Sequence, residues 1–186
     1  MAALMNFELF NSYEVKKIIT CDPHSFNLLK NEYGELGGNY EVFHHTEFIA
    51  KLLKDNKENI SESKAFKGKT IAYHDSCYLG RANGVYDAPR DILSYLDTDI
   101  VEMKSNKTTS LCCGAGGSQI FKEDEPGTGR INTLRTQEAI DAKATVVATA
   151  CPFCMTMLRD GVIEADKKDS MEVLDIAEIV AKGLSL

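Results

Sequence analysis

The chain has 186 residues, of which 44% are apolar and 26% are charged, and its net charge is -7. This length and composition suit one well-formed hydrophobic core with room for part of a second module. Nucleic acid is excluded as a partner, because an acidic surface repels a phosphate backbone and the sequence holds no dense block of Lys and Arg.

Short runs rich in β-branched residues alternate with amphipathic stretches along the chain. This alternation predicts an α/β fold with short, largely parallel sheets flanked by helices. Strands are expected at residues 17–20, 40–43, 70–73, 100–103 and 145–149. Helices, whose apolar residues recur at three- and four-residue spacing, are expected at residues 26–33, 46–54, 88–96, 130–144, 155–165 and 173–183.

Residues 56–68 are polar, charged and weakly periodic, which is typical of a linker. They divide the chain into two predicted parts, residues 1–58 and residues 66–186. A run of about 18 apolar residues is missing, as is the order of basic, apolar and small residues that marks a signal peptide. We therefore expect a cytoplasmic protein that does not insert into a membrane. A peripheral position on a membrane complex is compatible with this expectation.

The unusual feature of the composition is cysteine, which occurs six times in a chain with no export signal. Such usage favours metal ligation or redox chemistry over structural disulfides. Five of the cysteines fall in the second part: Cys77, the adjacent pair Cys112 and Cys113, and a Cys-x-x-Cys formed by Cys151 and Cys154. Zinc takes four protein ligands and a cubane cluster normally uses four thiolates, so either would leave one thiol over.

The predicted strands also suggest where these thiols lie. Ligands of open α/β sheets collect beyond the carboxyl ends of the strands. Cys77 follows the strand at 70–73, Cys151 follows the strand at 145–149, and Cys112 follows a short stretch ending at Leu111. We therefore expect three strand ends to converge on one centre, with Cys154 in the first turn of a helix that begins near Pro152.

Three motifs carry a family resemblance: HDSC at 74–77, CCGAGG at 112–117 and ACPFCM at 150–155. At this spacing, residues 70–184 resemble the cysteine-rich CCG domain of the B-type subunit of heterodisulfide reductases, of glycolate and lactate oxidation iron–sulfur subunits, and of related iron–sulfur oxidoreductases. The resemblance implies a [4Fe-4S] cluster, cubane or non-cubane. Its implied ligands are Cys77, Cys112, Cys113, Cys151 and Cys154.

Proteins of that family usually carry two such domains in tandem, and residues 6–54 resemble the tail of a first one. Asp22 and Ser25 occupy its two cysteine positions, Cys21 is shifted by one place, and the upstream CCG motif is missing. We expect one cluster only, a buried structural role for Cys21, and a chain truncated at its N-terminus relative to the family. An upstream ferredoxin-like or membrane segment would belong to a longer parent or a separate subunit.

The leading hypothesis is an iron–sulfur electron-transfer subunit or domain of an oxidoreductase complex, a component rather than a complete enzyme. The resemblance implies disulfide chemistry or redox chemistry linked to 2-hydroxy acids and quinones. No flavin or nicotinamide motif is present, so we expect a flavoprotein or ferredoxin-like subunit as a redox partner. Two alternatives stay open: a structural zinc-binding assembly module, and a dithiol redox protein that uses Cys151 and Cys154.

Four other polar residues lie near the motifs in the sequence. His74 is compatible with orienting the Cys77 loop, with donating a hydrogen bond to cluster sulfur, and with a structural role. Arg130, Asn132 and Arg135 lie on a predicted helix, where they would offset cluster charge or touch a partner. The default expectation for them is a solvated helix face with local salt bridges.

Overall fold

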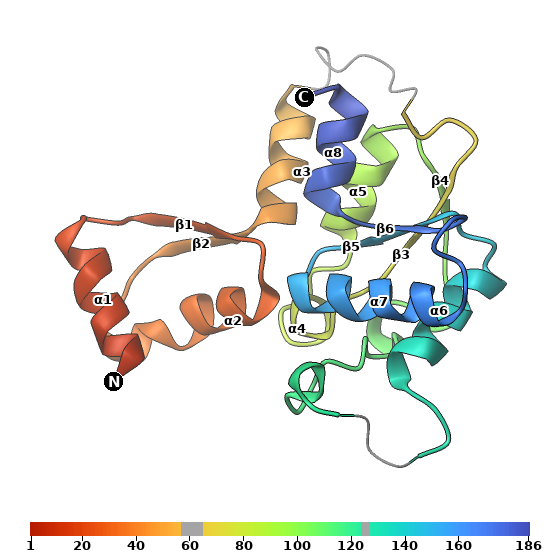
Figure 1. The fold of residues 1–186 in the computed structure, drawn as a ribbon. Coiled ribbons are helices and arrows are strands. Elements are labelled where there is room, and N and C mark those ends of the chain that lie inside the picture. The colour runs from red at the N-terminus through yellow and green to blue at the C-terminus, as the bar shows by residue number, and fades with distance from the viewer. Residues whose placement is uncertain (57–64, 124–126) are drawn as a thin grey trace.

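A computed structural model describes residues 1–56, 65–123 and 127–186 of the chain. Its strands form two parallel sheets, which confirms the expected α/β class (Figure 1). The smaller sheet pairs β1 (Lys17–Thr20) with β2 (Glu41–His44). The larger sheet has the order β4-β3-β5-β6, and its strands are β3 (Thr70–Tyr73), β4 (Asp99–Val101), β5 (Val146–Thr149) and β6 (Glu172–Asp175).

Helices cover both faces of the larger sheet (Figure 1). The α-helices of the described residues, including those of the N-terminal segment, are α1 (Ala2–Ser12), α2 (Pro23–Asn31), α3 (His45–Asp55), α4 (Cys77–Gly80), α5 (Asp87–Tyr95), α6 (Ile131–Asp141), α7 (Pro152–Glu164) and α8 (Ile176–Leu184). No helix among these residues is long and apolar enough to cross a membrane.

The two central strands, β3 and β5, separate two apolar cores. Ile71 and Tyr73 point into a core built with α3, α5 and α8, whereas Ala72 between them points into a core built with α6 and α7. Alternate residues of a strand face opposite sides, so both faces of these strands are buried and both must be apolar. Because both of their faces are covered, β3 and β5 are held firmly in place, and so are the positions at which the two strands end.

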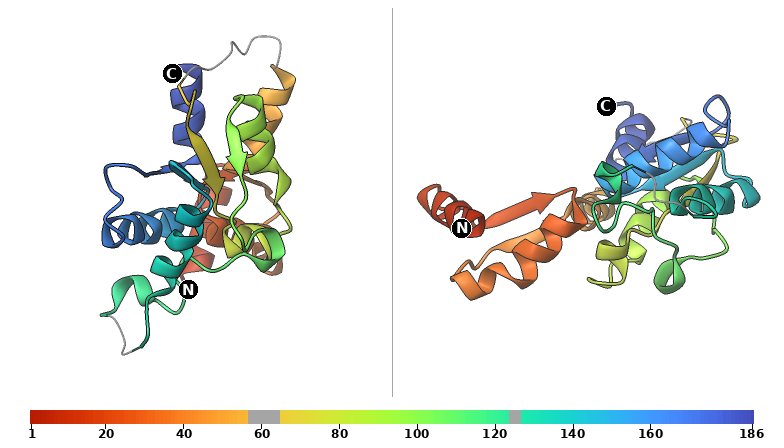
Figure 2. Two further views of the ribbon diagram at one scale, coloured as in Figure 1. Left: turned by 90° about the vertical axis from the view of Figure 1, so that its right-hand side faces the viewer. Right: turned by 60° about the horizontal axis from the view of Figure 1, so that its bottom comes forward.

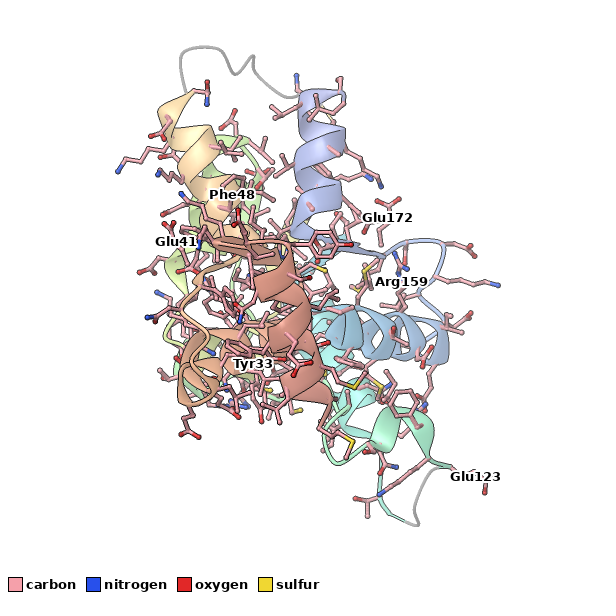
Figure 3. The ribbon with its side chains drawn as sticks, turned by 90° about the vertical axis from the view of Figure 1, so that its left-hand side faces the viewer. Tyr33, Glu41, Phe48, Glu123, Arg159 and Glu172 are labelled. Carbon is pink, nitrogen blue, oxygen red and sulfur yellow. The ribbon has the colours of Figure 1, made fainter. Side chains whose placement is uncertain are left out.

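The N-terminal segment projects away from the larger sheet (Figure 2). Its helix α1 has no buried residue, and it is held by local contacts, including a hydrogen bond of 3.3 Å from Asn6 to the hydroxyl of Tyr33. Tyr33 lies beside this helix in Figure 3. Helix α3 returns the chain to the main body, where it packs against α5 and α8.

The structure corrects the expected elements near both ends of the chain. The helix expected at 173–183 begins only at Ile176, since Glu172–Asp175 form β6 and the Asp175 carboxylate accepts the Ala177 N–H at 2.8 Å to cap α8. Helix α1 was not expected. Much of the linker expected at 56–68 falls on residues 57–64, outside the described residues.

Candidate metal centre

Two neighbouring strands bring the first and last of the three motifs together. In the larger sheet β3 pairs with β5 in parallel, so both end at the same edge. Four residues beyond the end of β3 the chain reaches Cys77, which opens α4, and two residues beyond β5 it reaches Cys151, the N-cap of α7. Pro152 is the first residue of that helix, and Cys154 lies in its first turn, both as expected.

The placement of the middle motif was predicted wrongly in one respect. Strand β4 ends at Val101, and a 3-10 turn at Lys107–Thr109 separates it from Cys112. The paired cysteines therefore reach the centre on a loop, so two strand ends, not three, converge there. Arg81 Nη1 supports this loop by donating a hydrogen bond of 2.6 Å to the Ser110 carbonyl.

All five motif cysteines line a single cavity of about 510 Å³. Cys113, Cys151 and Cys154 are buried, while Cys77 and Cys112 are partly exposed. The sixth cysteine, Cys21, does not line the cavity and is exposed, contrary to the expected buried role.

The five sulfurs contact one another in an unbroken string. The thiols of Cys77 and Cys113 both donate to Cys112, the thiol of Cys154 donates to Cys113, and Cys154 also contacts Cys151. The hydrogen bonds from Cys113 and Cys77 lower the pKa of Cys112, and the contact with Cys154 lowers the pKa of Cys151. The thiolate is the form that binds metal, so the string is suited to metal ligation.

The same hydrogen bonds raise the pKa of the thiols that donate them. Donation to Cys112 raises the pKa of Cys113 to about 12 and also raises the pKa of Cys77. The pKa of Cys154 rises because of its contacts with Cys113 and Cys151. A bound metal ion would displace the thiol protons, so the hydrogen bonds that raise these pKa values would no longer exist.

Backbone N–H groups reinforce the negative charge at the middle motif. The Gly114 N–H donates to the Cys112 sulfur at 3.3 Å, and the Gly116 N–H also points to this sulfur. Gly114 has a φ of +92°, and a Cβ built there would lie 3.2 Å from the backbone nitrogen of Asn132. Glycine at this position therefore lets the chain reverse, so that adjacent cysteines serve one cavity.

The N-terminal part supplies one wall of the cavity, a contribution that was not expected. Asp22, Pro23 and His24 line it. The His24 ring lies 4.2 Å from the Tyr78 ring and 5.4 Å from the Phe153 ring, centroid to centroid. The sequence held one indication of this contact, namely the resemblance of the Asp22 loop to the Cys151 loop. Loops that resemble each other in this way are expected to approach corresponding positions in the fold.

The Asp22 carboxylate is engaged within its own loop. It accepts the N–H groups of His24 and Ser25 at 3.1 and 3.0 Å and the Ser25 hydroxyl at 2.8 Å. Burial alone would raise its pKa, but the hydrogen bonds from Ser25 and His24 outweigh burial and lower the pKa of Asp22. This carboxylate therefore caps α2 as an anion.

The expected solvated face with local salt bridges is confirmed for Arg130, which is partly exposed and pairs with Glu164 at 3.6 Å, but it is wrong for Asn132 and Arg135. Asn132 and Arg135 are fully buried, and Arg135 reaches the loop that carries the first motif, where its Nε lies 3.0 Å from His74 Nδ1. One ring nitrogen of His74 and the sulfurs of Cys113 and Cys154 lie within 4.8 Å of one another. This arrangement adds a buried histidine and a buried arginine to the surroundings of the thiols.

Comparison with known proteins supports the expected resemblance. Residues 71–159 match the family described as Cysteine-rich domain, CCG. The chain is 44% identical over 185 residues to EtfAB:quinone oxidoreductase of Syntrophomonas wolfei, with 96% of this chain and 26% of the relative covered. It is 43% identical over 180 residues to the "Probable iron-sulfur-binding oxidoreductase FadF" of Bacillus subtilis, with 96% of this chain and 25% of the relative covered.

A third relative is the D-type subunit of the dihydromethanophenazine:CoB–CoM heterodisulfide reductase of Methanosarcina barkeri. It is 37% identical over 186 residues, which cover 97% of this chain and 44% of the relative. The chain thus spans about a quarter of the first two relatives and less than half of the third.

Proposed function

Because residues 71–159 of this chain are a cysteine-rich domain of the CCG type, we propose that it is an iron–sulfur electron-transfer domain of a larger oxidoreductase. The observation that carries the proposal is the string of five contacting sulfurs around one cavity. The names of the relatives, which include an iron-sulfur-binding oxidoreductase, support it.

The proposed ligands are Cys77, Cys112, Cys113, Cys151 and Cys154. A [4Fe-4S] cluster, cubane or non-cubane, supplies the capacity to take up and release electrons. The residues present fit such a group, because thiolates are its usual ligands and the cavity offers more of them than one zinc ion uses. The backbone N–H groups of Gly114 and Gly116 stabilise negative charge on the Cys112 sulfur.

Exposure suggests the side on which electrons enter and leave. Cys77 and Cys112 are partly exposed, whereas Cys113, Cys151 and Cys154 are buried. We propose that a flavoprotein or ferredoxin-like partner approaches over the partly exposed pair, since electron transfer favours short distances. A cytoplasmic location, at the periphery of a membrane complex, would keep the thiols reduced and available.

The names of the relatives indicate the reactions in which such a domain takes part. One relative is named as a quinone oxidoreductase and another as a component of a heterodisulfide reductase. We propose quinone-linked or disulfide-linked redox chemistry for the larger oxidoreductase, with this domain as a component.

We also propose that residues 1–58 correspond to the C-terminal half of a first domain of this type and that residues 66–186 form the cluster domain. The parallel pairing of β1 with β2, each followed by a helix, supports this division, because β5 and β6 are paired and followed in the same way. Glu41 and Glu172, which are labelled in Figure 3, are the first residues of β2 and β6, and they pair with Lys17 of β1 and Val146 of β5.

A zinc module is the second candidate, favoured by one observation. His74, Cys113 and Cys154 lie close enough to share one ion. Zinc would bind without sulfide and without visible absorption. With four ligands in all, it would leave at least two of the other three motif cysteines as free thiols.

Metal analysis of the anaerobically purified protein tests the proposal. We expect iron and acid-labile sulfide in comparable amounts, little zinc, and an EPR signal that changes on reduction. Cys113→Ser should lose iron or alter the signal, whereas Cys21→Ser serves as the matched control because Cys21 lies outside the cavity. Zinc without sulfide after reconstitution with iron and sulfide would contradict the cluster, and an unchanged signal in Cys113→Ser would remove the fifth ligand.

A further inference from the structure

A buried Arg–His pair stands behind the thiols. His74 follows β3 and is 1% exposed, and Arg135 belongs to α6 and is 0% exposed. Arg135 Nε donates to His74 Nδ1 at 3.0 Å. The guanidinium is held in place on its other side, because Nη1 donates to the Ser105 carbonyl at 2.6 Å and pairs with the Glu138 carboxylate.

The direction of this hydrogen bond fixes the tautomer of the histidine. A guanidinium has five donors and no acceptor, so Nδ1 of His74 must accept and must carry no proton. Because Nδ1 carries no proton, the imidazole ring is neutral. A neutral imidazole with a bare Nδ1 carries its proton on Nε2.

The other ring nitrogen of His74, Nε2, has to be considered together with the nearby thiols. Nε2 of His74 is buried and has no hydrogen-bond partner among the described residues. The Cys113 and Cys154 sulfurs are candidate acceptors, because a ring nitrogen of His74 lies within 4.8 Å of both. An N–H at Nε2 suits donation to sulfur, whereas metal ligation at Nε2 would require that nitrogen to be bare.

We propose that His74 is a hydrogen-bond donor to the sulfurs of Cys113 and Cys154 and not a metal ligand, and that Arg135 imposes this role by occupying Nδ1. The inference rests on the proposed cluster and adds two positioning residues to it. A donor to ligand sulfur stabilises the reduced state, which carries more negative charge, so the pair raises the reduction potential.

Nitrogen NMR of the metal-free full chain tests the tautomer without any cluster. We expect the His74 ring, labelled with ¹⁵N, to show a protonated Nε2 and an unprotonated Nδ1 near pH 7. A protonated Nδ1, or a ring protonated at both nitrogens, would overturn the inference. This measurement succeeds or fails independently of cluster binding, so a protein that held zinc or no metal would contradict the proposed function but leave the tautomer tested.

Potentiometry of the loaded protein tests the hydrogen bond to sulfur. In His74→Leu we expect full iron content and a roughly tenfold lower ratio of reduced to oxidised cluster at fixed ambient potential, about 59 mV for one electron. His74→Gln retains a side-chain N–H and should recover most of the shift. The matched control is His45→Leu, since His45 is buried but bonds to Asp175 and does not line the cavity.

Iron loss in both His74 variants, with a strong ¹⁴N coupling in the wild-type EPR signal, would identify His74 as a ligand and overturn the proposal. An unchanged potential in a loaded His74→Leu protein would overturn it as well. If His74→Leu failed to fold, His74→Gln and the NMR of the wild type would still decide between a donor and a ligand.

A double-mutant cycle tests the role of Arg135. Arg135→Gln should shift the potential in the same direction as His74→Leu and should allow a proton on Nδ1 of His74, because the guanidinium no longer occupies it. The double variant should then resemble His74→Leu alone, since Arg135 acts through the histidine. Additive shifts in the double variant would show that Arg135 acts separately and would overturn the positioning role.

Discussion

Two loops of this molecule open a helix in the same way and use the first turn of that helix differently. After β1, Asp22 caps α2 and Pro23 is the first helical residue. After β5, Cys151 caps α7 and Pro152 is the first helical residue. The Asp22 carboxylate closes capping hydrogen bonds with the turn, whereas the Cys151 sulfur faces the N–H groups of the turn without closing a capping bond.

The similarity of the N-terminal part and the cluster domain extends to the strand that follows each helix, β2 and β6. His44 ends β2 opposite Thr20, and Asp175 ends β6 opposite Thr149. Each of these two end residues caps the following helix in a capping box, with Glu47 in α3 and Glu178 in α8. The two halves thus share one local plan.

The difference teaches which part of that plan depends on the ligand. A carboxylate at the N-cap satisfies the helix end internally and needs nothing from outside. A thiolate is a weaker hydrogen-bond acceptor, so it keeps lone pairs free for metal while the same helix end stabilises its charge. The same strand–cap–helix arrangement therefore carries a self-contained cap at Asp22 and, at Cys151, a sulfur that is free for the proposed ligation.

The largest test of this comparison converts the second loop into the first. Cys151→Asp combined with Cys154→Ser should reduce iron content by roughly tenfold or more, because two ligands become a self-satisfied cap. The fold should survive, since Asp caps a helix better than Cys. Iron per chain and thermal unfolding of the metal-free protein measure the two effects, with Cys21→Ser as the control. Retention of full iron would show that this loop does not ligate the cluster.

The middle motif has no counterpart in the first half, and its turn provides the next test. Gly114→Ala should lower the free energy of unfolding of the metal-free protein by about 2 kcal/mol, because φ is +92° and the added methyl meets the backbone. Gly116→Ala is the matched control, since its φ is not positive and its Cβ would have nothing within 4 Å. Equal effects of the two changes in chemical denaturation would contradict a role for the Gly114 backbone.

A smaller effect is expected from the cap of the first half. Asp22→Ala should cost about 1 kcal/mol of unfolding free energy, the usual contribution of an N-cap. Iron content should hardly change, because Asp22 is a cap and not a ligand. A marked loss of iron would instead assign Asp22 to the cluster.

The same carboxylate gives a dependence on pH. Its pKa is lowered in the folded protein from the ordinary value of 3.8, so its stabilisation is present above that value and is lost as pH falls through the folded pKa. The difference in stability between the wild type and Asp22→Asn should therefore be constant near neutral pH and shrink below about pH 4. A difference that grew on acidification would contradict the sign of the shift.

Local patterns foretold much of this structure. The strands expected at 17–20 and 70–73 have the same bounds in the structure. Short runs of β-branched residues between polar residues are a local signal, so no knowledge of distant contacts is needed to recognise them. The presence of five thiols in one cavity also followed from their motifs and from the rule that ligands gather at strand ends.

Contacts between distant residues were beyond the sequence. The helix of Arg135 shows weak amphipathic character, so its pattern does not separate a buried arginine from a solvated one, and its partner His74 lies 61 residues away. Strand β6 was missed because its four residues run directly into the periodic pattern of α8. In both places a tertiary contact, not a local propensity, decided the outcome.

The string of five sulfurs has a consequence for the protein before any metal is bound. Air oxidation joins thiols in pairs, so an odd set always leaves one thiolate over, and that thiolate attacks a neighbouring disulfide and reopens it. The contacts that bring Cys154 against both Cys113 and Cys151 provide two competing partners for one thiol. We therefore expect the metal-free protein to undergo disulfide exchange and further oxidation. In the proposed metal-bound form, the five sulfurs would be protected because ligated thiolates are not free to form disulfides.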